Sequence, residues 1–312
     1  MNQTLQFQAG SLDQLAKFAA SGYLYAVVDS VDAPGIAEKA KELGTAGAAS
    51  LFCDSAEEEF WSVSPFLFRV EQPTLQWIAE TLWQQPWGVF VMSKSSMDEV
   101  RDHMRKFLVV LLPDGERWFF RFYDPRILKV YLPACNEAEL QVFYGPVRAF
   151  AMKTPEEEQL WIVQRASMSS AGEQTQAAAA AVGNGHGPWR VRPEQYAALT
   201  EAAHREFVAR VAAHLRQFFP ERCAELNDEA TATIIEAGVE RASAYGITGE
   251  GEVCRFVDLM FGFGHDFDSS AAFAWAVPLL RDENKTPTEK LDLIFAELMK
   301  MSQQQEGAIA GD

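Results

Sequence analysis

Two short segments carry the side chains that are best suited to chemistry. In the first, Gly264-His265-Asp266-Phe267-Asp268, an imidazole and two carboxylates lie within four residues. These groups are ligand types that proteins use to hold metal ions. The segment falls between two predicted helices, where glycine and aspartate commonly serve as C-cap and N-cap residues. We therefore interpret it as a helix boundary and predict no metal site.

The second segment is Arg121-Phe122-Tyr123-Asp124-Pro125-Arg126, an Asp-Pro turn with an arginine on each side. In such a turn Asp124 accepts hydrogen bonds from the backbone and pairs with a guanidinium fork. A polar functional site is one interpretation. We favour a structural clamp that fixes the turn at the end of a central strand.

Sequence motifs that accompany catalysis or cofactor binding are absent. The chain has no nucleophile elbow, phosphate-binding loop, zinc-binding His-Glu-x-x-His helix or calcium loop. Gly183, Gly185 and Gly187 are spaced as in a dinucleotide loop, but no strand precedes them, so we interpret them as part of a linker. His204 and His214 lie about three helical turns apart, too far to share one ion. The sequence predicts no catalytic residue and no cofactor.

The composition limits the class of partner. The chain has 312 residues and a formal net charge of -17, which repels nucleic acid and anionic membranes. Its four cysteines, Cys53, Cys135, Cys223 and Cys254, form no closely spaced pair, as expected in a reducing compartment. Neither a signal peptide nor an apolar run long enough to cross a membrane is present. We expect a cytoplasmic protein with no membrane insertion.

Residues 1–165 predict a mixed α/β lobe. Capping boxes begin helices at Ser11 and Ser96, and an Asp-Gly tip at residues 113–115 predicts a β-hairpin between residues 107 and 123. His103 is expected on the surface of the second of these helices. Further strands are predicted at 23–28, 48–52, 66–70, 88–92, 127–132, 145–152 and 160–163, with helices near 36–43 and after Pro73. We expect these strands to form a mixed sheet.

Residues 166–190 are rich in Ala, Gly, Ser and Gln without a core-forming period, which predicts a linker or mobile loop. Residues 191–312 are predicted to form an all-α lobe. Its helices are expected at 193–219, at 228–245 with Gly246 as the C-cap, around 253–261, and from a capping box at Thr286. The fold class is therefore α+β, followed by a helical lobe.

The segment from Phe119 to Arg126 resembles the central signature of a bacterial domain family of formerly unknown function, whose members are regarded as adaptor chaperones of type VI secretion. Other motifs occur in the same order, at residues 24–29, 51–52, 64–67, 88–90 and 143–147. Residues 242–248, 256–259, 264–268 and 289–291 are similar to a helical extension that often follows this domain. The resemblance covers most of the chain.

This resemblance implies a non-enzymatic adaptor that binds a secreted effector toxin in the cytosol and loads it onto a spike protein of the VgrG type. An acidic protein of two lobes could present a groove whose apolar side chains hold a helix or strand of the client and whose rim selects basic partners. The residues that bind the client are not identified by the resemblance. Two alternatives are an immunity protein that neutralises a neighbouring toxin and an enzyme that uses carboxylates near Asp124 or at Asp266 and Asp268.

Overall fold

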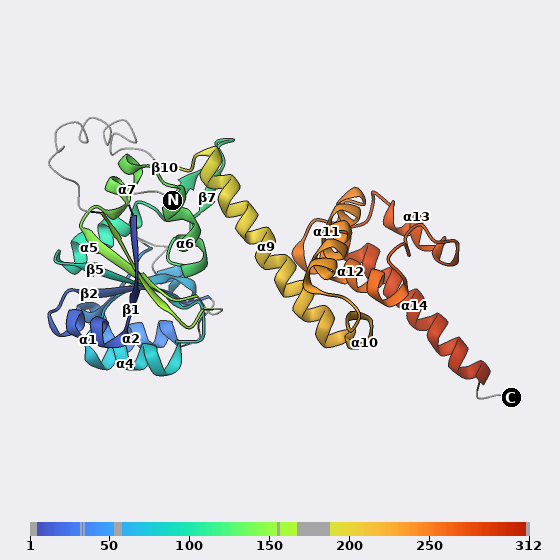
Figure 1. Cartoon of the computed structure of the whole chain (residues 1–312), viewed down its shortest axis with the longest axis horizontal. Helices are drawn as coiled ribbons and strands as arrows, with labels where there is room; N and C mark the ends of the chain where they lie inside the picture. The colour runs from blue at the N-terminus through green and yellow to red at the C-terminus, as the bar shows by residue number, and fades with distance from the viewer. Residues whose placement is uncertain are drawn as a thin grey trace. The chain divides into compact units, whose positions relative to one another are not determined.

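The computed structural model describes residues 5–31, 33, 35–52, 58–154, 157–166 and 188–309 (Figure 1). The chain divides into two compact units, Met1–Thr200 and Glu201–Asp312. Cys53 and the glycines between 183 and 187 lie outside the described residues, as does most of the predicted linker. The predicted lobe limits therefore stay a prediction.

The first unit is built on a seven-stranded sheet in the order β1-β9-β8-β5-β2-β4-β3, in which every neighbouring pair is antiparallel. The strands are β1 (Leu5–Gly10), β2 (Leu24–Asp29), β3 (Ala48–Ser50), β4 (Pro65–Arg69), β5 (Gly88–Ser93), β8 (Val147–Met152) and β9 (Leu160–Arg165). Its helices are α1 (Leu12–Ala20), α2 (Ile36–Gly47), α4 (Gln72–Thr81), α5 (Met97–Arg105), α6 (Pro125–Ala134), α7 (Glu137–Tyr144) and the 3-10 turn η1 (Trp61–Val63).

Helices cover both faces of this sheet, which gives the unit three layers (Figure 1). Successive side chains of a strand point to opposite faces. In β2, Leu24, Ala26 and Val28 pack with α1, α2 and α4 in one core. Tyr25 and Val27 pack with α5, α6 and α7 in the other. The central strands are buried on both faces and consequently show continuous apolar runs instead of alternation.

A smaller sheet in the order β10-β6-β7 lies in the same unit, formed by β6 (Val109–Leu111), β7 (Arg117–Phe119) and β10 (Trp189–Arg190). The predicted hairpin is confirmed as the antiparallel pair β6 and β7, although its strands are shorter than expected. β10 pairs with β6 in parallel, so this is the mixed sheet of the protein. The predicted fold class is confirmed, with the large sheet antiparallel throughout.

One predicted strand is wrong, because residues 127–132 belong to helix α6. Periodicity alone does not separate a short buried helix from a buried strand. The local signals decide: Asp124 is the N-cap residue and Pro125 occupies the first turn, where its missing N–H costs nothing. The expected position of Asp124 at the end of a central strand is also wrong, since β7 is an edge strand and ends at Phe119.

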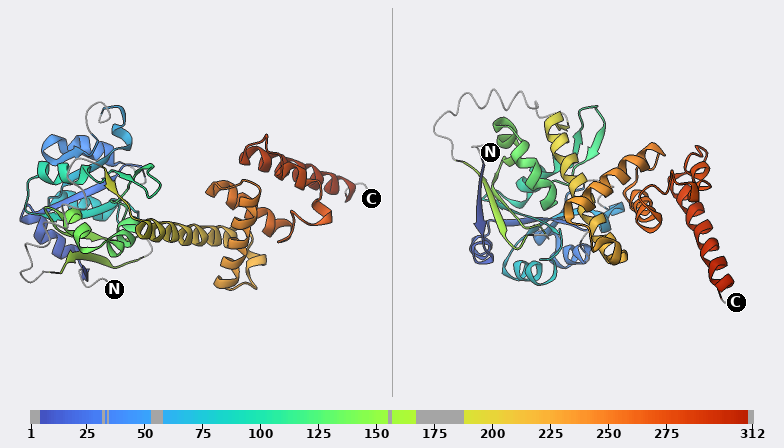
Figure 2. Two further views of the ribbon diagram at one scale, coloured as in Figure 1. Left: turned by 90° about the horizontal axis from the view of Figure 1, so that it is seen from above. Right: turned by 45° about the vertical axis from the view of Figure 1, so that its right-hand side comes forward.

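A buried polar network fixes the beginning of α9 (Pro193–Phe218) to α7. The guanidinium of Arg192 donates to Glu139 Oε1 at 2.6 Å and to the Ala134 carbonyl at 2.8 Å. Gln195 donates to Glu139 Oε2 at 2.9 Å. Glu139 also closes the capping box with Asn136 at the start of α7. The carboxylate of Glu139 thus ties the start of α7 to the start of α9, which is one helix over Pro193–Phe218 (Figure 2).

The second unit is helical. It contains most of α9, then α10 (Pro220–Cys223), α11 (Asp228–Ala244), α12 (Glu250–Phe263), η2 (Ala271–Phe273), α13 (Ala276–Leu280) and α14 (Pro287–Ile309). Its core is centred on α12, where Val253, Phe256, Val257 and Met260 are buried at helical spacing. No helix within the described ranges combines the length and apolarity that crossing a lipid bilayer would require.

Candidate functional site

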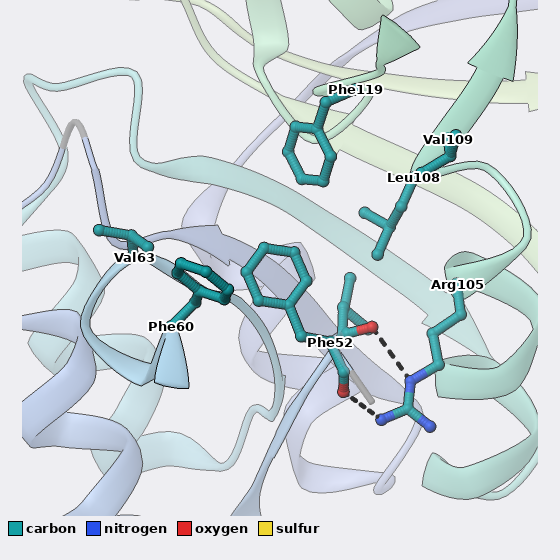
Figure 3. Close-up of a pocket in the computed structure, with 8 residues that line it drawn as sticks. Phe52, Phe60, Val63, Arg105, Leu108, Val109 and Phe119 are labelled. Carbon is teal, nitrogen blue, oxygen red and sulfur yellow. Dashed lines mark hydrogen bonds between the residues drawn. The ribbon is translucent and has the colours of Figure 1, made fainter. Parts of the chain in front are cut away.

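An open apolar groove of about 460 Å³ lies in the first unit, between the end of β3 and the hairpin of β6 and β7 (Figure 3). Its described lining residues are Leu51, Phe52, Phe60, Val63, Arg105, Leu108, Val109 and Phe119. Among these described lining residues, only Arg105 is charged. The volume lies within the range of about 300–1,000 Å³ that is typical of ligand pockets.

The groove exposes large apolar side chains to solvent. Phe60, Val63, Val109 and Phe119 are each between 42% and 46% exposed, whereas Leu51 and Leu108 form a buried floor. Phe52 and Phe119 face each other across the groove in an edge-to-face contact, with 5.8 Å between the ring centroids (Figure 3). Contiguous exposed apolar side chains of this kind mark binding surfaces. The acidic residues Glu58 and Glu59 precede Phe60 and are exposed.

Two sheet edges flank the groove. β3 is the last strand of the large sheet, and Leu51 and Phe52 follow it directly. β7 is the outer strand of the small sheet, and its residue Phe119 is paired with Val109 of β6, so both side chains lie on the same face. An edge strand carries backbone groups that its own sheet leaves unpaired. The groove therefore offers apolar side chains next to a possible backbone-pairing edge.

Arg105, at the end of α5, fixes one wall of the groove. Its guanidinium donates to the carbonyl oxygens of Ser50 at 3.0 Å, Leu51 at 3.1 Å and Phe52 at 2.7 Å. Figure 3 shows the side chain turned toward these carbonyls and away from the centre of the groove. A lysine carries its donors on one nitrogen and lacks the planar fork with which Nε and Nη2 of Arg105 reach these acceptors. Arg105 thus holds the segment after β3 in a fixed conformation.

The segment Arg121–Arg126 positions the hairpin from the opposite side. Arg121 forms an ion pair with the buried carboxylate of Asp29 at the end of β2. Asp124 Oδ1 accepts from the backbone N–H of Arg126 at 2.9 Å and from its Nε at 3.0 Å, and Asp124 Oδ2 accepts from Nη2 at 2.7 Å. This geometry is that of a helix cap combined with a guanidinium fork, which anchors the chain between β7 and α6.

His103 was expected on a helix surface, and that expectation is wrong. The ring is 8% exposed, and its Nε2–H donates to the Phe143 carbonyl at 2.8 Å. Burial lowers the pKa of His103 below its usual range, and the charge of Lys106 acts in the same direction, while the hydrogen bond to Phe143 opposes both. The imidazole is therefore a neutral core group that joins α5 to the end of α7.

Cys135 and Tyr131 of this core are also held in their neutral forms. Burial, reinforced by the charge of Glu139, raises the pKa of Cys135 to about 12. Burial raises the pKa of Tyr131 well above its usual value, and its hydroxyl accepts a hydrogen bond of 2.6 Å from the Trp189 indole. A protonated thiol is a poor nucleophile. These residues contribute packing and hydrogen bonds to the wall that supports the small sheet.

The segment 264–268 forms part of the second unit. Gly264 ends α12 as its C-cap with a positive φ of 114°, as predicted. Asp268 is buried, forms an ion pair with Arg241 and accepts a hydrogen bond of 2.9 Å from the Tyr245 hydroxyl. The carboxylate thus ties the loop to α11.

A group of three ligand-type side chains was not anticipated from the sequence. His214, Cys254 and Asp258 come together in the second unit from two helices, with candidate ligand atoms within 4.8 Å of one another. From the sequence, His214 is compared only with His204. Cys254 is interpreted there as an isolated thiol. The spacing of four residues between Cys254 and Asp258 was a signal, but the partner helix could not be identified from spacing alone.

Comparison with protein families gives one match: residues 24–142 match the model of the domain described as "Domain of unknown function (DUF4123)". The matched range includes every described residue that lines the groove, together with the segment Arg121–Arg126. Comparisons with curated proteins and with solved structures find no match.

Proposed function

We propose that this protein is an adaptor chaperone that binds a secreted effector of a type VI system and delivers it to a VgrG-type spike protein. The observation that carries the proposal is the exposed apolar groove within the matched domain. The family that matches residues 24–142 is associated with type VI secretion effectors. A groove of this kind suits an apolar segment of a client that would otherwise aggregate.

The client segment that fits this surface best is an extended strand. The ladder bonds from Phe120 N to the Leu108 carbonyl and from Leu112 N to the Glu116 carbonyl fix the pairing of the hairpin. In an antiparallel pair, bonded residues alternate with residues whose backbone groups face away. The N–H groups of Arg117 and Phe119 therefore point to the outer edge of β7. A client strand could pair there and place alternate apolar side chains beside Phe119.

Charge supports a client with basic residues next to its apolar segment. The chain carries a net charge of -17, and Glu58 and Glu59 are exposed beside Phe60. Opposite charge at the rim of an interface increases the association rate and the selectivity more than the affinity. The apolar contacts in the groove would supply most of the binding energy, and raising the salt concentration would mainly slow association.

The first test is binding to the effector encoded beside this gene, using purified proteins and calorimetry. Phe119→Ser should weaken binding by roughly 30-fold, the effect of an interface hot spot. Phe263→Ser in the second unit is the matched control, because Phe263 is also 42% exposed and also lies edge-to-face on another phenylalanine, Phe273. Equal affinity of the two variants for the effector would contradict the assignment of the groove.

A second pair of variants tests pairing at the β7 edge. Arg117→Pro removes an N–H that faces outward and leaves the bonds between β6 and β7 in place, so binding should be lost with little change in thermal stability. Arg117→Ala removes the same side chain but keeps the N–H, and it should bind like the wild type. If both variants bind equally, the client does not extend this sheet.

Genetic tests separate the adaptor from its alternatives. Deletion of an adaptor gene abolishes export of the effector, whereas an immunity protein protects cells from the toxin and is dispensable for export. If deletion leaves export intact and sensitises cells to the neighbouring toxin, the proposed function is wrong. An enzyme would be indicated by a turnover that Asp124→Asn abolishes without changing the melting temperature.

A further inference from the structure

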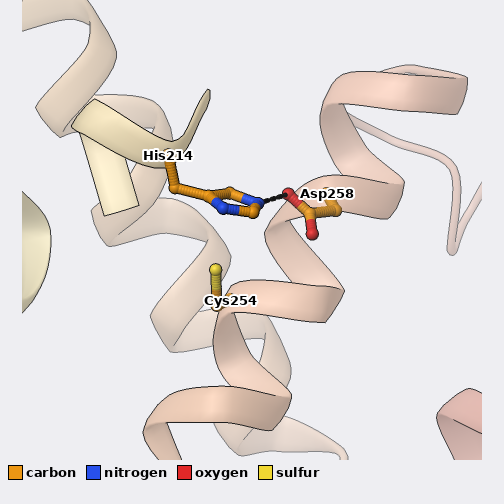
Figure 4. Close-up of side chains that lie close together, drawn as sticks. All are labelled: His214, Cys254 and Asp258. Atoms are coloured by element: carbon orange, nitrogen blue, oxygen red, sulfur yellow. Dashed lines mark hydrogen bonds and ion pairs between the residues drawn. The ribbon is translucent and has the colours of Figure 1, made fainter. Parts of the chain in front are cut away.

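The group formed by His214, Cys254 and Asp258 lies apart from the groove, in the second unit. Cys254 and Asp258 are one helical turn apart on the same face of α12, and they face His214 on α9 (Figure 4). His214 Nε2 lies 2.9 Å from Asp258 Oδ1. The three candidate ligand atoms lie within 4.8 Å of one another. From this geometry we propose that the three side chains form a binding site for Zn²⁺.

The surrounding core holds the three ligands in place. The two helices pack through buried residues that include Val211 and Leu215 of α9 and Val257 of α12. The imidazole of His214 contacts the ring of Phe218 in a tilted arrangement, with 4.6 Å between the ring centroids. The three ligand side chains therefore project from two helices that share one core.

The donor atoms favour zinc over harder ions. A thiolate and an imidazole are soft or borderline ligands that select Zn²⁺, whereas Mg²⁺ and Ca²⁺ require mainly oxygen ligands. A zinc site with three protein ligands completes its tetrahedron with water. A cavity of about 270 Å³ adjoins the group and includes His214 and Cys254 in its lining, so it has room for that water. The side chains of His214 and Asp258 are 33% and 22% exposed, which leaves a path for the ion.

Two nearby arginines, Arg255 and Arg210, form ion pairs with carboxylates outside the group. The guanidinium of Arg255 donates to Asp292 at 2.6 Å and lies over the ring of Phe295, and Arg210 pairs with Glu206 and Glu250. The Asp258 carboxylate and the Cys254 sulfur lie in a half-buried space, where a divalent ion would offset the charge of the carboxylate. A metal here would connect α9 and α12 within the second unit.

Titration with Co²⁺ tests the site directly, using full-length protein without an affinity tag and treated with a chelator. Co²⁺ should bind with one-to-one stoichiometry and give a thiolate-to-cobalt charge-transfer band, and Zn²⁺ should displace it. Cys254→Ser should remove this band, and His214→Gln and Asp258→Asn should each weaken binding by at least about 10-fold. The controls are His204→Gln on the same helix and Cys223→Ser in the same unit, which should bind Co²⁺ like the wild type.

Thermal stability provides a readout that does not depend on the cobalt spectrum. Zn²⁺ should raise the melting temperature of the second unit in the wild type and in both controls, but not in the Cys254→Ser variant. Circular dichroism of each metal-free variant shows whether it is folded before titration. The proposal is overturned if the wild type shows no saturable binding, or if Cys254→Ser keeps the charge-transfer band. It is also overturned if His204→Gln and His214→Gln bind Co²⁺ equally.

Discussion

Replacement of Asp124 by alanine should destabilise the first unit by about 2–3 kcal/mol. Loss of an N-cap hydrogen bond costs about 1 kcal/mol, here the bond of 2.9 Å to the backbone N–H of Arg126. The two further bonds from the Arg126 guanidinium contribute about another 1–2 kcal/mol. The contribution of these two bonds is reduced for screening by solvent, because the Arg126 side chain is 28% exposed. The Asp124 side chain is only 4% exposed.

For a unit of this size, that loss lowers the melting temperature by about 4–12 °C. Tryptophan fluorescence during urea unfolding is a suitable assay, since seven of the eight tryptophans (residues 61, 77, 83, 87, 118, 161 and 189) lie in the first unit. The matched control is Asp114→Ala. Asp114 also accepts a 2.9 Å bond from the N–H two residues on, but it lies in the exposed turn of the hairpin. This control should cost less than about 1 kcal/mol.

A melting temperature of Asp124→Ala within 1 °C of the wild-type value would refute the structural role of this carboxylate. Asp124→Asn refines the test, because the amide retains an oxygen for the cap but loses its charge toward Arg126. We expect this variant to lose about 1–2 kcal/mol, less than the alanine variant. If both variants were equally destabilised, the charged contact with the Arg126 guanidinium would account for the effect and the cap would contribute nothing measurable.

Three further predictions concern the same unit. Gly145→Ala should lower the free energy of unfolding by at least about 3 kcal/mol, because φ is +45° and the new Cβ would lie 2.2 Å from the His103 ring. Gly115 also has a positive φ but lies in open space, so Gly115→Ala should cost only about 1 kcal/mol. A urea titration measures both values. Since burial lowers the pKa of His103 below 6.5, the unfolded chain binds more protons, so stability should fall as the pH drops from 6.5 towards 5. His103→Gln should lose this part of the acid sensitivity, and an unchanged pH dependence would contradict the role of His103. Arg105→Lys should increase proteolysis after Ser50 without unfolding the unit, and unchanged cleavage would contradict its role.

Local signals with a direct physical mechanism were predictable from the sequence. The capping boxes at Ser11 and Ser96 are present with both reciprocal hydrogen bonds, and Thr286 forms the same arrangement with Glu289. The Asp-Gly tip marked the hairpin correctly. Such features depend on residues within one turn of each other, so sequence alone contains the information that determines them.

Features that depend on contacts between distant segments were not predictable. The groove joins residues near 51, 60, 105, 109 and 119, and no local pattern indicates that these positions meet. His103 follows a helical pattern typical of a surface, but α7 and the residues after it cover the ring. Residues 127–132 were assigned to a strand because a short apolar run fits either structure, and the cap at Asp124 was interpreted as a turn.

Among the described residues, the two edges that flank the groove differ in how their backbone groups are used. Both strands have three residues, so their length does not separate them. At β3, Arg105 occupies the carbonyls of the last residue and of the two residues that follow, and a nearby charge is one of the usual means by which proteins block edge pairing. β7 instead exposes Trp118 and Phe119 beside its open edge, where such side chains favour aggregation unless a partner covers them. A protein that is stable alone would gain from a charged residue at either position. On the proposed function, a client strand that pairs with β7 would shield these side chains from solvent.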